Sequence, residues 1–269
     1  MKRLLALSCL LAAMFVPASL AEGASVPASQ ASTSGHADTQ VHNDIAGGAV
    51  GSVAGVVAVS TFSQDCTGAL IAPRIVLTAA HCLEGVSNST TIGVRFNNTR
   101  QSLGVSRYYR APGFNPTTHE NDAAVLVLKS RSKTAPLHVA TAEPLAGTGA
   151  RITGYGQHTY TSGIAHVAYS AATTIQPLAS CQATWAEFNS AMPSSDICAV
   201  NAPYNNATLT RGDSGGPLLV KSPAGDWSVA GINDLVVIPN GVYDGAIPQA
   251  FGRVDTLRPW IESKIAQSR

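Results

Sequence analysis

A serine among glycines near the C-terminal end of the chain is the first candidate for chemistry. Ser214 stands in the segment GDSGG, where a tight turn could present its hydroxyl to a substrate. A serine hydroxyl is a weak nucleophile unless a base within hydrogen-bond reach accepts its proton, and that base needs an orienting acceptor of its own. All seven histidines precede Ser214, the last being His166, so the chain lacks the Ser–Asp–His order of hydrolases that carry a nucleophile elbow.

His81 and Asp122 are the best candidates for the base and its acceptor. His81 follows the apolar segment IVLT and precedes Cys82, which could hold the histidine's turn in place through a disulfide. Asp122 precedes the apolar run AAVLVL, where a half-buried carboxylate could accept a hydrogen bond from an imidazole. Each also has an ordinary structural interpretation, as a structural histidine and as a turn residue before a strand. The other histidines, including His119 in TTHEND, lie in polar contexts and receive no catalytic role.

Short strands must carry these residues. From about Ile45 onward, short apolar runs alternate with clusters of Gly, Pro, Asn and Ser, which is typical of an all-β barrel or sandwich. A long helical pattern of apolar residues occurs in residues 255–267, and a shorter helix is expected around PLASCQATW. The predicted strands are 53–59, 69–71, 75–78, 91–96, 124–128, 150–154, 218–220, 227–232 and 251–254.

The N-terminal segment has the pattern of an export signal. Lys2 and Arg3 precede an apolar run of 13 residues, and small residues follow Pro17, so residues 1–21 are predicted to be a secretory signal peptide. The run is too short to span a membrane, and no later run reaches that length. Residues 22–44 are predicted to be a flexible pro-segment, with a disordered mature N-terminus as the alternative. We therefore expect a secreted, extracellular protein.

Besides Cys9 in the predicted signal peptide, the chain has four cysteines, an even number that suits an oxidising compartment. Three pairings are possible, and the pairs closest in sequence, Cys66–Cys82 and Cys181–Cys198, are favoured. Neither a Cys-x-x-Cys motif nor a His/Cys cluster with zinc spacing is present, so no metal site and no cofactor are predicted.

Composition indicates a globular chain. Of its 269 residues, 45% are hydrophobic and 12% are charged, which allows a sizeable core. The formal net charge of +1 gives no electrostatic support for a nucleic-acid partner.

Taken together, these segments resemble the chymotrypsin/trypsin-like serine protease family. TAAHC, NDAAVLVL and GDSGGPL match the family's three landmark segments in the same order, with 41 and 92 positions between their functional residues. ITGYGQ, ICAV and PQAFGRVDTLRPWI are similar to further family segments. The resemblance implies a protease domain over residues 45–269, with two six-stranded antiparallel β-barrels at about 45–135 and 145–254. The catalytic cleft would lie between the barrels, and the helix at 255–267 would follow them.

The resemblance further implies a serine endopeptidase that works through an acyl-enzyme. Ser214 would attack the scissile carbonyl, His81 would transfer the protons and Asp122 would orient the imidazole. The backbone N–H groups of Gly212 and Ser214 would form the oxyanion hole. Protein or peptide substrates and protein inhibitors are the expected partners of a monomeric protein. A catalytically idle, protease-like binding protein is the alternative.

Two segments bear on activation. DIAGG, at residues 44–48, resembles the family's activation site, so cleavage before Ile45 would free an amine that pairs with Asp213. Because Asp44 and not Arg or Lys precedes the bond, a protease directed at Asp or Asn, or another route of maturation, is expected to cut it.

By the same resemblance, Thr208 would lie at the base of the specificity pocket, whereas Val236 and Gln249 replace common pocket glycines. A narrow pocket for a small or medium uncharged side chain is therefore predicted. Asp234 stands where the family usually has a serine beside the triad aspartate, and two such carboxylates would raise the pKa of one of them. No role is assigned to Asp234.

Overall fold

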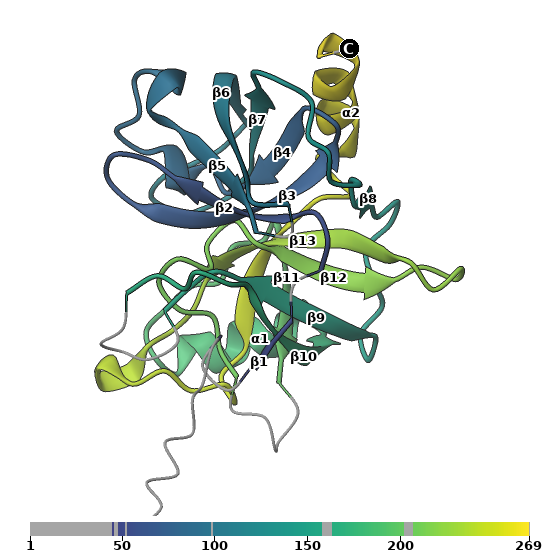
Figure 1. Cartoon of the computed structure of the whole chain (residues 1–269). Coiled ribbons are helices and arrows are strands. Elements are labelled where there is room, and N and C mark those ends of the chain that lie inside the picture. The colour runs from purple at the N-terminus through teal and green to yellow at the C-terminus, as the bar shows by residue number, and fades with distance from the viewer. Residues whose placement is uncertain are drawn as a thin grey trace, which may run out of the picture. The chain divides into compact units, whose positions relative to one another are not determined.

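The computed structural model describes residues 45, 48–51, 53–97, 99–157, 163–201 and 207–268. The predicted signal peptide and pro-segment lie outside the described residues. Within the described part, the chain forms two six-stranded antiparallel β-barrels that follow one another in sequence, as Figure 1 shows. The predicted fold class is therefore confirmed.

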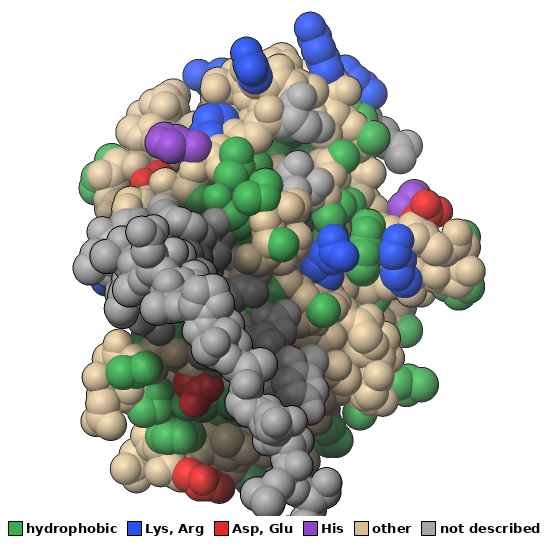
Figure 2. All heavy atoms as spheres, turned by 60° about the horizontal axis from the view of Figure 1, so that its bottom comes forward, with side chains coloured by type: hydrophobic (Ala, Val, Ile, Leu, Met, Phe, Trp, Pro, Cys, Tyr) green, Lys and Arg blue, Asp and Glu red, His purple; other side chains and the backbone are tan. Residues whose placement is uncertain are grey.

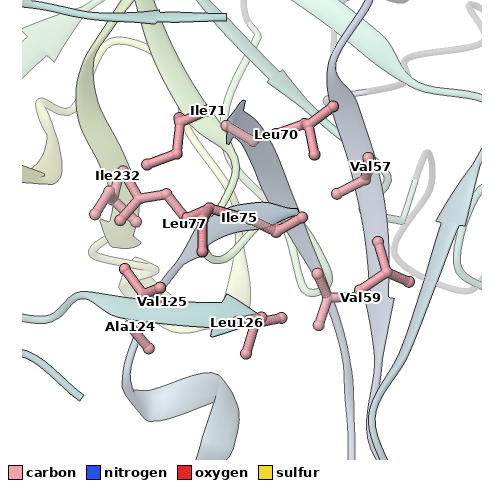
Figure 3. Close-up of a cluster of buried hydrophobic side chains, with 14 of the residues drawn as sticks. Val57, Val59, Leu70, Ile71, Ile75, Leu77, Ala124, Val125, Leu126 and Ile232 are labelled. Atoms are coloured by element: carbon pink, nitrogen blue, oxygen red, sulfur yellow. The ribbon is translucent and has the colours of Figure 1, made fainter. Parts of the chain in front are cut away.

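The first barrel closes in the strand order β2-β3-β4-β7-β6-β5, with β5 pairing back to β2. Its core consists of aliphatic side chains that come from most of the strands, as Figure 3 shows. The Ile232 side chain, which comes from the second barrel, also belongs to this cluster. The elements are β2 (Val56–Ser60), β3 (Asp65–Ala72), β4 (Ile75–Thr78), η1 (His81–Leu83), η2 (Ser89–Thr91), β5 (Gly93–Phe96), β6 (Gln101–Arg110) and β7 (Ala124–Leu128).

The second barrel has the order β10-β11-β14-β13-β12-β9 and closes through the pairing of β9 with β10. Two short strands join its sheet, β1 at β10 and β8 at β13. The elements are β1 (Ala49–Val50), β8 (His138–Val139), β9 (Gly149–Gly154), β10 (Tyr169–Gln176), α1 (Leu178–Ala186), β11 (Asp196–Val200), β12 (Pro217–Lys221), β13 (Trp227–Leu235), η3 (Pro239–Gly241), β14 (Gln249–Arg253) and α2 (Arg258–Gln267).

The strand predictions are most accurate where the sequence is continuously apolar, and several strands of mixed composition were missed. The predicted bounds of β4 and β7 are confirmed, and every side chain of these strands is buried. By contrast, β6, β10 and β11 were not predicted. In β6, most of the ten residues are exposed or half-buried, so the apolar signal is weak. In β10, the residues are largely Ser, Ala and Thr, which do not stand out from a loop.

Helix α2 follows the second barrel but packs on the first. It begins at Arg258, three residues after the predicted start, and Pro259 occupies its first turn, where the missing proline N–H is tolerated. Ile261 is fully buried in the core cluster of the first barrel, and the Lys264 ammonium lies 4.5 Å from the centre of the Tyr109 ring. The chain therefore ties the two barrels together at its C-terminal end.

Both predicted disulfides are present. Cys66–Cys82 joins β3 to η1, and Cys181–Cys198 joins α1 to β11.

Figure 2 shows one face of the molecule, on which Lys and Arg side chains gather along the upper edge and the few acidic side chains lie apart. No helix in the described part of the chain combines the length and the apolar composition needed to cross a membrane.

Candidate active site

Two neighbouring strands bring His81 and Asp122 to the same end of the first barrel. Strands β4 and β7 are antiparallel neighbours in which Thr78 pairs with Ala124. His81 follows β4 and opens η1, while Asp122 lies two residues before β7. The residues after one strand and before the other therefore meet at the same edge.

The Asp122 carboxylate holds His81 through both of its oxygens. Oδ1 accepts the backbone N–H of His81 at 2.8 Å, and Oδ2 lies 2.5 Å from Nδ1 of the ring. This network assigns the proton to Nδ1, so Nε2, which lies 3.9 Å from Cys82 Sγ, carries the lone pair that can accept a proton. The Gln64 side chain donates to the His81 carbonyl at 2.9 Å, and the Cys66–Cys82 disulfide fixes the next residue. We refer to His81 and Asp122 as the His–Asp pair.

The electrostatics of the His–Asp pair suit a base that can accept a proton. Burial opposes the ionised form of Asp122, which is fully buried, but the adjacent imidazoles of His119 and His81 hold its pKa below the usual range. Burial also lowers the pKa of His81, yet the hydrogen bond and charge of Asp122 raise it above its ordinary value overall. An imidazolium formed at His81 would therefore be stabilised by Asp122.

Ser214 lies in a turn that only glycine-rich sequence can make. Gly212 and Gly215 have φ angles of 100° and 80°, which favour glycine. A Cβ atom at Gly215 would lie 2.1 Å from Thr78 Oγ1, so the turn can approach the end of β4 closely because it lacks a side chain there. Ser214 is thus brought against the strand that leads to His81.

Thr67 of β3 fastens this turn to the first barrel. Its backbone N–H donates to the Ser214 carbonyl at 2.8 Å, and its hydroxyl donates to the Gly212 carbonyl at 2.8 Å. The same hydroxyl accepts the N–H of Tyr155, from the second barrel, at 2.9 Å. One buried threonine therefore connects the serine turn with both barrels.

The backbone N–H groups of the turn fall into two classes. Those of Asp213, Gly215 and Gly216 donate to backbone carbonyls. Those of Gly212 and Ser214 donate to no group in the described part of the chain. Two unused donors on the same turn, next to a serine hydroxyl, can receive an anionic oxygen.

A cavity of about 610 Å³ opens beside this turn. Gly212 and Ser214 form part of its wall together with Ile164 and Arg211 from the second barrel. Residues around the Cys66 end of β3, including Gln64, form the opposite wall. The cavity therefore lies between the two barrels and gives a substrate access to the serine.

Asp213 points away from the cavity into the second barrel. Its carboxylate accepts the N–H groups of Gly156 and Thr210 at 2.8 Å each and the Thr210 hydroxyl at 2.9 Å. Burial raises the pKa of Asp213 to about 6 despite these hydrogen bonds. Because this value exceeds the unfolded one, the group's contribution to stability falls as the pH rises from 3.8 towards 6. Ile45, its predicted partner in activation, is buried in the hydrophobic cluster of the same barrel.

The predicted pocket residues lie together in part. The Gln249 side chain accepts the N–H of Leu209 at 3.0 Å and donates to the Ala207 carbonyl at 3.5 Å, so its amide bridges the backbone on both sides of Thr208. Thr208 and Gln249 are both buried. Val236 is half-buried and packs on the same hydrophobic cluster as Ala207 and Leu209.

Sequence reasoning missed two residues at this site and left a third without a role. His119 Nδ1 lies 2.7 Å from Asp234 Oδ1 and 3.6 Å from Asp122 Oδ2. Asp234 Oδ1 is 3.8 Å from His81 Nδ1, so Asp234 lies beside the His–Asp pair, as its place in the sequence had suggested. Asp196 of β11 is fully buried nearby and interacts electrostatically with Asp234. His119 stands three residues before Asp122 in the sequence, and this short spacing could have predicted that it lies at the same site.

The ligand atoms of His81, His119, Asp122 and Asp234 all lie within 4.8 Å of one another, close enough in principle to share a metal ion. The two shortest contacts, 2.5 Å and 2.7 Å, each join a ring nitrogen to a carboxylate oxygen. The 2.7 Å contact has the length of a charge-assisted hydrogen bond and the 2.5 Å contact is shorter still, so we describe the group as a hydrogen-bonded cluster.

Comparison with known proteins agrees with this geometry. The sequence profile of the trypsin family matches residues 44–261. Mouse granzyme B(G,H) is 30% identical over 213 residues, which cover 76% of this chain and 81% of the granzyme. Trypsin beta of Drosophila erecta is 28% identical over 209 residues, covering 74% of this chain and 78% of that trypsin.

Two solved structures have the same fold. Human heparin binding protein superposes with a TM-score of 0.65 at 21% identity, covering 81% of this chain and 95% of that one. Mouse neuropsin, a serine protease, also gives a TM-score of 0.65, at 22% identity, covering 78% and 94%. The chain belongs to the trypsin family of chymotrypsin-like proteins. Within that class it is a serine endopeptidase, which acts on protein or peptide substrates.

The connection through Thr67 leads to a first prediction. Thr67→Val removes the hydroxyl that serves Gly212 and Tyr155 and leaves two buried polar groups unpaired. We expect the free energy of unfolding to fall by about 2–3 kcal/mol, measured by urea denaturation, together with a lower rate of peptide hydrolysis. Thr173→Val is the matched control, because the buried Thr173 hydroxyl has no hydrogen-bond partner among the described residues. Equal losses in the two variants would contradict the role of Thr67.

Proposed function

We propose that Ser214 is the nucleophile of a covalent peptidase mechanism in which the His–Asp pair transfers the proton. The observation that carries the proposal is the double hold of Asp122 on His81, which assigns the proton to Nδ1 and leaves Nε2 as the acceptor. The placement of the serine turn against the end of β4 supports it. A base within hydrogen-bond reach would turn the weak Ser214 hydroxyl into an effective nucleophile.

In the first half of the reaction, the Ser214 hydroxyl attacks the carbonyl carbon of the substrate while His81 Nε2 takes its proton. The tetrahedral oxyanion receives hydrogen bonds from the N–H groups of Gly212 and Ser214, the two donors left unused in the turn. The imidazolium, stabilised by Asp122, then gives its proton to the leaving amine. The peptide C–N bond breaks and an acyl-enzyme remains.

In the second half, a water molecule replaces the amine. His81 takes a proton from the water as it attacks the acyl carbon, and the same two N–H groups hold the second oxyanion. Collapse of this intermediate returns the proton to Ser214 Oγ and releases the carboxylic acid. The side chains of the site, the peptide and one water molecule account for every proton that moves.

The nucleophile is tested with Ser214→Ala. We expect the variant to lose hydrolysis of a peptide substrate by about 10⁴-fold or more and to lose labelling by a fluorophosphonate probe. The exposed Ser130→Ala variant is the control and should keep both. A wild-type protein that binds peptides but neither cleaves them nor takes the label would instead support the idle binding protein.

We also propose that the enzyme prefers a small or medium uncharged side chain before the cleaved bond. Thr208, Val236 and Gln249 carry no charge, and the Gln249 amide is engaged by the backbone around Thr208. Gln249 and Val236 also occupy volume that glycine would leave free. A cationic side chain would therefore be desolvated without a partner, which is costly.

Peptide-library profiling of the protein processed before Ile45 tests this preference. We expect Ala, Val, Ser and Thr to dominate before the cleaved bond. Thr208→Asp should raise cleavage after Lys and Arg relative to wild type by about tenfold. Thr208→Ser should leave the profile unchanged. Dominance of Arg, Lys or large aromatic residues in the wild-type profile would refute the proposal.

Finally, we propose that the protein is exported through residues 1–21 and is activated by removal of residues 22–44. In the uncut chain, the Ile45 nitrogen is part of a peptide bond and carries no charge. Cleavage would make it an ammonium group that can pair with Asp213, whose buried carboxylate has a raised pKa that a counter-charge would lower. The burial of Ile45 in the cluster of the second barrel supports this partnership.

N-terminal sequencing of the secreted, active protein tests the activation. We expect the sequence to begin at Ile45 and expect Asp213→Asn, cut at the same bond, to lose activity by at least about tenfold because the ammonium lacks its partner. Asp226→Asn, at an exposed aspartate in a hairpin, is the control. A fully active protein that begins at Glu22 would exclude this route.

A further inference from the structure

A second histidine and aspartate lie directly against the His–Asp pair. His119 and Asp234, which we call the second pair, are joined at 2.7 Å between Nδ1 and Oδ1. The ring centres of His119 and His81 are 5.2 Å apart. The two pairs also contact each other crosswise, at 3.6 Å between His119 and Asp122 and at 3.8 Å between Asp234 and His81.

The surrounding elements hold His119 in this position. The Glu120 carboxylate accepts the N–H groups of Ser194 and Ser195 at 2.8 Å and 3.0 Å, and the Asn121 N–H donates to the Ser195 hydroxyl at 2.9 Å. The loop that carries His119 is therefore fastened to the segment before β11. Asp234 comes from β13, at an irregularity in its pairing with β14.

Three buried carboxyl groups meet here and need compensation. Asp122 and Asp196 are fully buried and Asp234 is nearly so, and Asp196 Oδ2 and Asp234 Oδ2 have no hydrogen-bond partner among the described residues. Two neighbouring carboxylates cannot both stay ionised in such surroundings unless a cation or protons accompany them. His119 is the base that contacts both Asp122 and Asp234.

We propose that His119 is a positioning residue whose imidazolium, paired with Asp234, keeps the charge around the His–Asp pair in balance. The pair His119–Asp234 contributes no net charge when the proton resides on His119. The net charge next to His81 is then that of the ionised Asp122, although the Asp234 carboxylate also lies beside the ring. Loss of Asp234 leaves an unbalanced positive charge beside His81, whereas loss of His119 requires Asp234 to take up a proton.

The titration properties of the cluster agree with this arrangement. Hydrogen bonds that the His119 ring donates to the carboxylates of Asp122 and Asp234 raise the pKa of His119 to about 10, so the imidazole is protonated in neutral solution. Burial raises the pKa of Asp234 above its usual range, the hydrogen bond from His119 opposes this rise, and the charge of Asp122 adds to it. Burial and the charge of Asp234 raise the pKa of Asp196 to about 9, so this group carries its proton. Glu120, the remaining acid, is bound by Ser194 and Ser195, and its pKa is lowered by those hydrogen bonds against the opposing effect of burial.

Removal of Asp234 and removal of His119 change the charge next to His81 in different ways. In Asp234→Asn, the His119 imidazolium has lost its counter-charge and opposes protonation of His81. In His119→Asn, the cation is gone, so the buried Asp234 carboxyl group beside the ionised Asp122 takes up a proton and has little effect on protonation of His81. The double variant removes both charges and approaches the wild-type balance.

The test rests on the proposed function and uses the pH dependence of kcat/KM in the protein processed before Ile45. Because the acidic limb reports protonation of the base in the free enzyme, Asp234→Asn should move it to lower pH by about one unit, whereas His119→Asn should leave it close to its wild-type position. The double variant should return the limb close to its wild-type position. His138→Asn, at an exposed histidine of β8, is the control and should leave the limb unchanged. The proposal would be overturned if the acidic limbs of all the variants coincided with that of the wild type, or if both single variants shifted the limb in the same direction.

A second measurement separates this proposal from the catalytic one. NMR titration of the histidine rings in Ser214→Ala requires no activity. We expect the His119 ring to stay protonated above pH 8 in Ser214→Ala and to lose its proton at lower pH once Asp234→Asn is added. A His119 ring that titrates near its ordinary value in Ser214→Ala would overturn the charge balance whether or not the enzyme is active. Failure of the proposed function would instead appear as an inactive wild-type protein with the expected titrations.

Discussion

The hydrogen bonds of Thr67 are the constraint on which the site depends. The Thr67 backbone N–H donates to the Ser214 carbonyl, and the Thr67 hydroxyl donates to the Gly212 carbonyl. The same hydroxyl accepts the N–H of Tyr155, which comes from the second barrel. The threonine is fully buried, so these bonds are not weakened by exchange with water. The serine turn belongs to one barrel and the histidine to the other. Their separation is therefore set by a few short contacts at the barrel junction instead of by a flexible connection.

A second constraint is electrostatic. The first barrel places a buried carboxylate behind His81, and strand β13 adds another carboxylate at a position beside it. Such crowding would normally protonate one of the acids and weaken the hold on the imidazole. His119 and the protonated Asp196 allow the cluster to remain buried without accumulating negative charge. The site thus contains more acidic groups than the chemistry of the His–Asp pair requires, and a histidine that compensates for them.

How well each strand could be predicted from the sequence depended on the residues within that strand. Strands β4 and β7 are buried along their whole length, so their apolar runs marked both bounds. Strand β6 shows a mixed pattern of exposure, and β10 consists largely of small polar residues, so neither carries a strong local signal. Their conformation comes from pairing with neighbours, β6 with β5 and β7, and β10 with β9 and β11. Pairing of this kind between distant segments leaves little trace in a short window of sequence.

The sequence by itself determined the family, the order of His81, Asp122 and Ser214, the two disulfides and the uncharged character of the predicted pocket. Each of these depends on residue types at fixed positions within short segments. The tertiary structure alone decided that His119, Asp234 and Asp196 meet at the His–Asp pair. These residues lie on a loop before β7, on β13 and on β11, and only closure of both barrels brings the three segments together. Their charges interact because burial excludes water, and burial is a property of the folded chain.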